Sequence, residues 1–373
     1  MSVEAQAAVE RRTSSVELFW DLVFVFAITQ VSTLLAHDLT WAGFGRAMLV
    51  LALVWWAWSA FVWVTNAHDP TAPLVRSTMF VAMILTFIVA LAVPRAFGDD
   101  ATIFVLAYAG VRFIHLGLYV DAGRRGNASL SAIAGFGTTV TIGMVLLFVG
   151  SEVGDPARTI LWVAAAAIDY AGPAWLTRER LVALQRVAVA HFAERYSLFI
   201  IICLGESIIA VGLGATGHEL NGELVAGVAL SLLVTIGLWW TYFGQVADAA
   251  EERLRTHDQP VLAAADGYSY LHLLLVAGII IFAVGAKNAV EHVADPLSDP
   301  ARLAFCGGVA LYLAGHAAFV LRMMRSLNVN TLLAALACLV VFAVGADLAA
   351  WATAALVVAV LGLLVIRETQ LTA

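Results

Sequence analysis

The chain has 373 residues, of which 62% are hydrophobic and only 13% charged, and its formal net charge at pH 7 is −7. A soluble protein of this length needs far more polar surface, so the composition excludes a soluble globular class and predicts a polytopic membrane protein. Residues 1–13 are polar, and no small-residue cleavage site follows the first apolar run. We therefore expect the first span to be retained rather than removed as a signal peptide.

Apolar runs of about 20 residues mark the membrane spans, because that length of helix crosses the hydrocarbon core. Twelve such runs lie near residues 15–36, 43–65, 75–95, 101–120, 131–150, 159–176, 193–213, 223–246, 267–287, 302–322, 331–346 and 348–366. The last two are separated by little more than Gly345 and Asp347. The alternative is one long helix there, which gives eleven spans and moves the C-terminus to the other side.

The distribution of positive charge predicts the orientation. In the twelve-span arrangement, fourteen of the 20 Lys and Arg residues fall on the side of the N-terminus, five fall on the opposite side, and Arg112 lies within a span. Because Lys and Arg are enriched in cytoplasmic segments, both termini are expected on the cytoplasmic side of the membrane.

Two stretches resemble each other and indicate an internal duplication. Span one begins with Glu17, Leu18 and Phe19, and span seven begins with Glu194, Arg195 and Tyr196; spans two and eight carry the runs WWAW and WWTY. Two six-span halves in parallel orientation follow, a common plan in secondary transporters. The predicted divisions are a cytoplasmic segment 1–14, a first half 15–176, a linker 177–192, a second half 193–366 and a tail 367–373.

Span one carries charge near its cytoplasmic end. Glu17 and Asp21 lie one turn apart on one face, whereas Gln30 points elsewhere. Two carboxylates at this place either favour the dipole of the helix N-terminus or together hold an exchangeable proton. Asn66, at the inner end of span two, is expected to be interfacial or to join the same network.

Span four contains the least expected charge. Arg112 lies near its middle and forms a polar stripe with Tyr108, His115 and Tyr119. A guanidinium inside a membrane needs a carboxylate, a carbonyl or an anionic ligand. Asp21 and Glu206 are the candidate partners. Either the pair is a fixed lock between helices, or Arg112 is an anion clamp or part of a proton relay.

Span seven has Glu194 and Arg195 at its start and Glu206 deep inside. Eleven residues on a helix return to within about 20° of the same face, so Arg195 and Glu206 point the same way. A charge at mid-membrane costs roughly 2.5–3.5 kcal/mol, so it normally faces a partner or a water-filled cavity. His272 in span nine is a further candidate site residue, whereas Asp169 in span six receives no role.

The sequence lacks the local motifs of the common cofactor and metal sites. It contains no P-loop, Rossmann glycine pattern, HExxH, GxSxG or paired zinc spacing. We therefore expect no cofactor, no metal, no nucleic-acid partner and no ATP-driven activity of the chain alone. The expected partners are the lipid bilayer and a small-molecule, ion or lipid substrate; no catalytic residue and no oligomeric state is specified.

Three stretches resemble the bacterial low temperature requirement A (LtrA) family: 17–31 (ELFWDLVFVFAITQV), 191–208 (HFAERYSLFIIICLGESI) and 239–243 (WWTYF). The resemblance extends over nearly the whole chain and matches at Glu17, Asp21, Gln30, Glu194, Arg195, Gly205 and Glu206, with Ser197 where the family pattern has Gly. It implies an all-helical integral membrane protein and supports the choice of these residues, without implying a biochemical activity.

These observations favour an all-α secondary transporter with about twelve transmembrane helices and a central site at Arg112 and Glu206. His115, His272 and Asp21 would bind substrate or couple ions, and Glu17, Glu194, Arg195, Gln30 and Asn66 would form a gate. The alternatives are an intramembrane enzyme that acts on a lipid or isoprenoid by acid–base chemistry, and a structural membrane protein without turnover.

Overall fold

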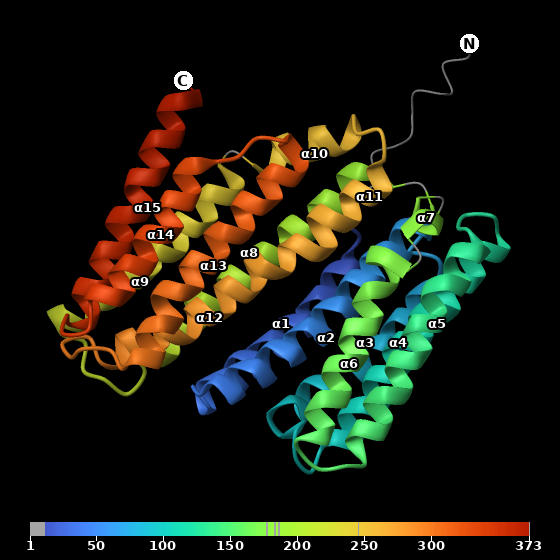
Figure 1. Ribbon diagram of the computed structural model, residues 1–373, viewed down its shortest axis with the longest axis horizontal. Coiled ribbons are helices and arrows are strands. Elements are labelled where there is room, and N and C mark those ends of the chain that lie inside the picture. The colour runs from blue at the N-terminus through green and yellow to red at the C-terminus, as the bar shows by residue number, and fades with distance from the viewer. Residues whose placement is uncertain (1–11, 177, 183, 186, 245, 373) are drawn as a thin grey trace. The chain divides into compact units, whose positions relative to one another are not determined.

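The structure, a computed structural model, describes residues 12–176, 178–182, 184–185, 187–244 and 246–372. Within these ranges the regular elements are helices, with a single isolated antiparallel bridge between Pro296 and Ala349 and no strand. The α-helices (Figure 1) are α1 Ser15–His37, α2 Trp41–Ala67, α3 Pro73–Ala92, α4 Ala101–Arg124, α5 Leu130–Ser151, α6 Ala157–Ala171, α7 Arg178–Leu181, α8 Val189–Ala215, α9 Gly222–Phe243, α10 Ala247–Arg255, α11 Pro260–Ala264, α12 His272–Glu291, α13 Asp299–Met324, α14 Val329–Val344 and α15 Ala350–Thr372. The prediction of an all-α membrane protein is confirmed.

Most of these helices match the length of a bilayer. Among the described residues, ten helical segments are long and apolar enough to cross a membrane, and α14 is a shorter apolar helix. Helix α6 has 15 residues and continues into a π-helical turn, Gly172–Leu176, at the place of the sixth predicted span. Helices α14 and α15 are separate, so the alternative of one long C-terminal helix is wrong.

The ninth span begins earlier than predicted. Helix α11, a π-helical turn at Ala265–Leu271 and α12 form one helical segment from Pro260 to Glu291. Pro260 occupies the first turn, where its missing N–H breaks no helical hydrogen bond. The hydropathy signal missed this start because Asp266 lies close to it.

The described residues divide into two compact units. Unit 1 contains residues up to Leu34, Gly45–Tyr196 and Leu254–Ser269; unit 2 contains Leu35–Phe44, Ser197–Arg253 and Tyr270 onwards. The boundaries thus cross α8 and the π-helical turn before α12, and the predicted duplication into halves 15–176 and 193–366 stays a prediction.

Helix α2 is the core of unit 1. Its span is 83% buried, and Trp55 and Trp58 on it are almost completely enclosed. A helix that is apolar on every side is stable only where other helices surround it. Helices α3 and α4 pack together in the same unit, as do α5 and α6.

Unit 2 is built on a close contact between α12 and α13. A Cβ atom added at Gly278 would lie 2.5 Å from the backbone nitrogen of Tyr312, and one at Gly285 or Gly308 would meet the backbone of Phe305 or Phe282. Glycine at these positions therefore lets the two backbones approach, as small residues do between membrane helices.

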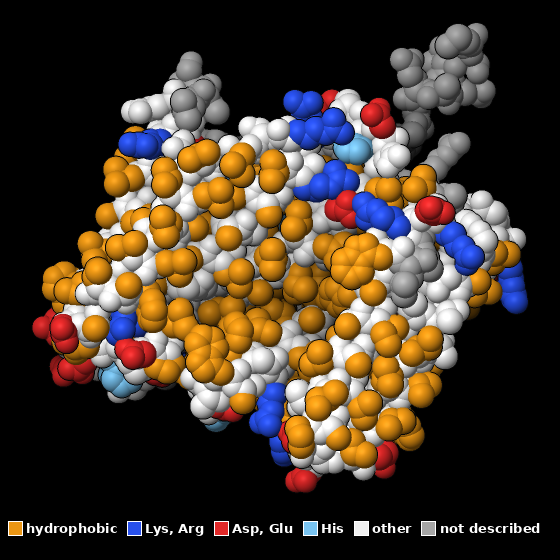
Figure 2. All heavy atoms as spheres, viewed as in Figure 1, with side chains coloured by type: hydrophobic (Ala, Val, Ile, Leu, Met, Phe, Trp, Pro, Cys, Tyr) orange, Lys and Arg blue, Asp and Glu red, His pale blue; other side chains and the backbone are white. Residues whose placement is uncertain are grey.

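Figure 2 shows hydrophobic side chains over the visible flanks of the helices, with Lys, Arg, Asp and Glu gathered mainly near the helix ends. Exposed examples are Ile84 on α3 and Leu363 on α15, at 63% each. Lipid-facing helices have this pattern, since their outer faces meet hydrocarbon rather than water.

Candidate functional site

A buried carboxylate–imidazole contact and a buried ion pair join α1 to α8 within unit 1. The Nε2 atom of His191 lies 2.9 Å from Oε1 of Glu17, and Nη2 of Arg195 lies 2.7 Å from Oδ1 of Asp21. All four side chains are at most 1% exposed. Each helix contributes residues four apart, one turn along the same face, and the pairs occur in the same order on both helices. The two helices therefore run parallel here, and we call these four residues the charged ladder.

The start of α1 places Glu17 in the ladder. Ser14 donates from its backbone nitrogen and its hydroxyl to Oε2 of Glu17, at 3.0 and 2.7 Å. The bond from the Ser14 N–H is the half of a capping box in which the carboxylate of the third helical residue reaches back to the residue before the helix, and it satisfies a free N–H group at the helix start. Glu17 thus has a capping role through Oε2 and contacts His191 through Oε1.

Glu194 fixes the residue before this cap. Its Oε2 accepts hydrogen bonds from the backbone nitrogen and the hydroxyl of Thr13, at 2.9 and 2.8 Å. Glu194 is half-buried, at the edge of the ladder. The structure thereby brings together Glu17, Asp21, Glu194 and Arg195, which the sequence selected separately.

The second pair of the ladder leaves polar atoms without partners. Oδ1 of Asp21 accepts from both Nη2 of Arg195 and the indole nitrogen of Trp58, the latter at 2.8 Å. Among the described residues, Oδ2 of Asp21 and the Nε and Nη1 atoms of Arg195 have no hydrogen-bond partner. The pair is therefore held at one atom of each group rather than as a two-bond fork.

Asn66 joins the ladder through His191. Its Oδ1 accepts from the backbone nitrogen of Ala188 at 3.0 Å, which fixes the amide orientation, and its Nδ2 lies 3.5 Å from Nδ1 of His191. An amide nitrogen cannot accept a proton, so Nδ1 is the accepting atom of the ring in this arrangement. A neutral His191 consequently carries its proton on Nε2, where it donates to Glu17.

Arg112 has a different partner from the two that the sequence indicated. Its Nη2 atom lies 3.0 Å from both carboxylate oxygens of Asp169 on α6, so the expectation of pairing with Asp21 or Glu206 is corrected. Asp21 is already held by Arg195 and Trp58, and helix α6 brings Asp169 to α4. Arg112 is 1% exposed and Asp169 3%.

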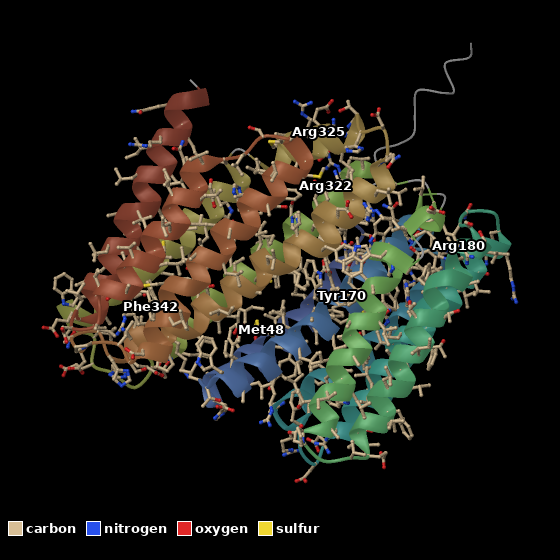
Figure 3. The ribbon with its side chains drawn as sticks, in the orientation of Figure 1. Met48, Tyr170, Arg180, Arg322, Arg325 and Phe342 are labelled. Carbon is tan, nitrogen blue, oxygen red and sulfur yellow. The ribbon has the colours of Figure 1, made fainter. Side chains whose placement is uncertain are left out.

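Neighbouring aromatic residues support the Arg112–Asp169 pair. The ring of Tyr170, labelled in Figure 3, stacks on that of Trp56 with 4.1 Å between centroids, and its hydroxyl donates to the carbonyl of Ala52 at 2.7 Å. Trp56 also hydrogen-bonds to Asp169. These contacts fix α6 against α2.

His115 and Tyr119 continue the stripe of α4 next to Arg112. Their rings meet edge to face with centroids 5.1 Å apart, and Phe136 of α5 lies 6.1 Å from His115 and 5.3 Å from Tyr119. The hydroxyl of Tyr119 is buried without a hydrogen-bond partner among the described residues, and Nδ1 of His115 makes no regular hydrogen bond there.

A chain of hydroxyl groups runs beside the ladder. The hydroxyl of Tyr196 lies 2.7 Å from Oγ of Ser59 and 2.8 Å from Oγ of Ser269. Ser269 also accepts from Trp55 at its carbonyl, at 2.7 Å, and from Trp63 at its hydroxyl, at 2.8 Å. The π-helical turn explains this contact, because such a turn interrupts the regular helical hydrogen bonding of its carbonyl groups.

The remaining candidates lie outside these clusters. Gln30 is half-buried on α1. In unit 2, Glu206 is 3% exposed on α8, and His272 is fully buried with Nε2 2.8 Å from the hydroxyl of Tyr242. Within the described part of the chain, no three His, Cys, Asp or Glu side chains are grouped so as to hold a metal ion.

Sequence reasoning missed two partners, His191 and Asp169. The signal for His191 was present, since it precedes Arg195 by four residues just as Glu17 precedes Asp21. Asp169 had the signal of a carboxylate in an apolar span, but nothing local connects it to Arg112.

Comparisons with known proteins extend over most of the chain. The family model described as bacterial low temperature requirement A protein matches residues 12–366. An uncharacterized protein of Rhizobium meliloti (strain 1021) is 32% identical over 317 residues, which cover 82% of this chain and 76% of that protein. No solved structure matches the chain.

Proposed function

This chain belongs to the bacterial low temperature requirement A family, and on that premise we propose that it is a proton-coupled secondary transporter of the inner membrane. The observation that carries the proposal is the charged ladder, with the buried Glu17–His191 contact at its centre. A carboxylate and an imidazole in direct contact are the groups that membrane transporters use to move protons.

The net charge of the ladder favours a coupling role over a purely structural one. With both carboxylates ionised, Arg195 positive and His191 neutral, the charges sum to −1 − 1 + 1 + 0 = −1. A buried net charge is costly in a membrane, and a proton taken up by the ladder from water would return the sum to zero. A lock between helices could instead use apolar residues at equal or lower cost.

Thr13, Ser14 and Glu194 form the gate in this proposal. They lie at the N-terminal end of α1, which the charge distribution predicts to be cytoplasmic, and their hydrogen bonds end on the two helices of the ladder. Loss of the Thr13–Glu194 contacts would open the ladder to water from that side.

Glu206 is assigned to the transport path in unit 2. It shares α8 with Arg195, and eleven residues of helix place the two side chains on nearly one face, about 16 Å apart along the axis. Its burial at 3% in a membrane-spanning helix is the observation that supports the assignment.

The test is uptake into proteoliposomes. Solutes that raise the melting temperature of the purified protein would be offered as labelled compounds, with and without an imposed pH gradient. Gradient-dependent uptake is expected for the native protein and for Glu219→Gln, an exposed control, and should be lost in Glu206→Gln. Uptake that does not depend on the pH gradient would contradict proton coupling. Uptake that is unchanged in Glu206→Gln would contradict the assignment of Glu206.

A further inference from the structure

Three membrane-helix arginines, Arg112, Arg195 and Arg302, are almost completely buried, and they differ in how their nitrogens are used. Arg302 on α13 is 5% exposed, and each nitrogen has an acceptor: Nε the carbonyl of Phe342 at 3.0 Å, Nη1 the carbonyl of Leu297 at 3.1 Å, and Nη2 the carboxylate of Asp299 at 2.8 Å. This is the arrangement expected of an arginine with a structural role.

Arg112 is only partly satisfied. Its Nη2 atom contacts Asp169 and its guanidinium also contacts the hydroxyl of Tyr108, whereas Nε and Nη1 make no regular hydrogen bond with a described residue. Nε carries one N–H group and Nη1 carries two, so at least two of the five N–H groups of this guanidinium are uncommitted. An uncommitted donor in a membrane interior costs far more than one at a surface, which makes this arrangement a candidate for ligand binding.

The uncommitted donors are accompanied by two further polar side chains. His115 and Tyr119 lie three and seven residues after Arg112 on α4, and at 100° per residue all three fall within about 60° of one helix face. Both are nearly completely buried. The hydroxyl of Tyr119 lacks a partner in the described part of the chain, and Nδ1 of His115 makes no regular hydrogen bond there, although the His115 ring also contacts the backbone of Arg112 one turn before it. One face of α4 therefore presents a guanidinium, an imidazole and a phenol, each with free hydrogen-bonding capacity.

The α4 face and the charged ladder differ in net charge, and this decides which of them can bind an anion. With a neutral His191 the ladder has a net charge of −1 and would repel an anion, although Arg195 also has uncommitted nitrogens. The Arg112–Asp169 pair is neutral when both groups are ionised, and among the described residues no second Lys or Arg is paired with it. Such a site can accept one negative charge more readily than the two of a phosphate dianion, and a planar carboxylate matches the fork of guanidinium N–H groups.

We propose that the α4 face formed by Arg112, His115 and Tyr119 binds the carboxylate group of a small organic acid. The assignment rests on the proposed transport function and names the substrate class for it. Arg112 donates from Nε and Nη1 to the carboxylate, and His115 and Tyr119 complete its hydrogen bonds. The rings of Phe61 and Phe136, 6.2 and 6.1 Å from His115, provide an apolar surface for the rest of the molecule.

Binding to the purified protein in lipid nanodiscs tests this directly and needs no transport. Isothermal titration would compare benzoate with benzamide, its uncharged analogue, and with inorganic phosphate. Oleate would be titrated separately, to distinguish a fatty acid of the bilayer from a water-soluble acid. We expect one of the two carboxylates to bind, and benzamide and phosphate to bind at least about 10-fold more weakly.

Arg112→Lys is the decisive variant. The native pair uses a single nitrogen, so a lysine can still contact Asp169 while the fork of Nε and Nη1 is lost. Affinity for the carboxylate should fall at least about 10-fold. The matched control is Arg302→Lys, in which a fully committed arginine is replaced: its melting temperature should fall and its affinity should not change.

A second variant keeps the test usable if Arg112→Lys does not fold. If Arg112→Lys does not fold, Arg112→Gln combined with Asp169→Asn removes both charges together and avoids an unpaired carboxylate. Failure of both carboxylates to bind the native protein, or equal affinity in the Arg112 variants, would overturn the assignment. If carboxylates bind but no solute is taken up, the binding site stands and the transporter proposal is refuted. If only other solutes are taken up with protons and no carboxylate binds, the transporter proposal stands and the binding site is refuted.

Discussion

The imidazole of His191 lies 2.9 Å from the carboxylate of Glu17 at a place where neither side chain is exposed to solvent. The two residues are 174 positions apart in the chain. Each is followed one helical turn later, on the same helix, by a member of the Asp21–Arg195 ion pair. The contact therefore depends on α1 and α8 lying parallel and in register, and it is the relationship from which the proposed proton coupling follows.

Replacing Glu17 by Gln should uncouple transport at a modest cost in stability. The amide oxygen can still accept from Nε2 of His191, but the amide nitrogen cannot accept from Ser14, and the residue no longer carries a charge or takes up a proton. We expect solute uptake to continue down its concentration gradient and to lose its response to an imposed pH gradient. The exposed Glu219→Gln should behave as the native protein, and a Glu17→Gln protein that still follows the pH gradient would refute the role of Glu17.

Replacing Asp21 by Asn should destabilise the protein by about 3–5 kcal/mol, because Arg195 then keeps a buried charge without its counterion. Adding Arg195→Gln should restore most of the loss. A double-mutant cycle, measured by reversible unfolding in mixed detergent micelles, checks this. Losses that simply add in the double variant would show that the two groups do not interact.

Asn66 should determine the tautomer of His191. In the native protein the ¹⁵N chemical shifts of a neutral His191, assigned by comparison with His191→Gln, should show the proton on Nε2. Asn66→Leu removes the amide that faces Nδ1, so the tautomer ratio should become mixed. Identical shifts in both proteins would mean that Asn66 does not position the ring.

The contact between α12 and α13 predicts a large effect from a small substitution. Gly308→Ala would place a methyl group against the backbone of Phe282, at a cost of about 1–3 kcal/mol in stability. The control is Gly362→Ala on α15, where nothing lies within 4 Å of the added atom. Its stability should rise slightly, since alanine favours helix over glycine, and thermal unfolding distinguishes the two.

A pH-dependent contribution is expected at Asp155, outside the membrane helices. Hydrogen bonds from Thr159 hold the pKa of this carboxyl below its ordinary value of 3.8, assisted by Arg46 at 2.9 Å. A lowered folded-state pKa stabilises the protein above the ordinary value, and the contribution disappears as pH falls through the folded-state pKa. Asp155→Asn should therefore cost less than about 1 kcal/mol at neutral pH and nothing in strong acid. Melting temperatures at the two pH values check this, and a deficit that persists in acid would contradict it.

The sequence determined the class and most of the local structure. Helices and their membrane-crossing lengths follow from runs of apolar residues, a property that each segment carries by itself. The polar residues Glu17, Asp21, Glu194 and Arg195 could be selected in the same way, because a charge in an apolar run is visible without knowing its neighbours.

Only the tertiary structure decided which of these residues meet. Asp21 and Glu206 were the candidate partners for Arg112, with Glu206 favoured, but the carboxylate that contacts it is Asp169, and Asp21 contacts Arg195. No periodicity in one helix specifies which face of another lies against it, since that depends on packing such as the stacking of Tyr170 on Trp56. The sequence thus shows that charges are buried, and the packing of the helices determines how they are paired.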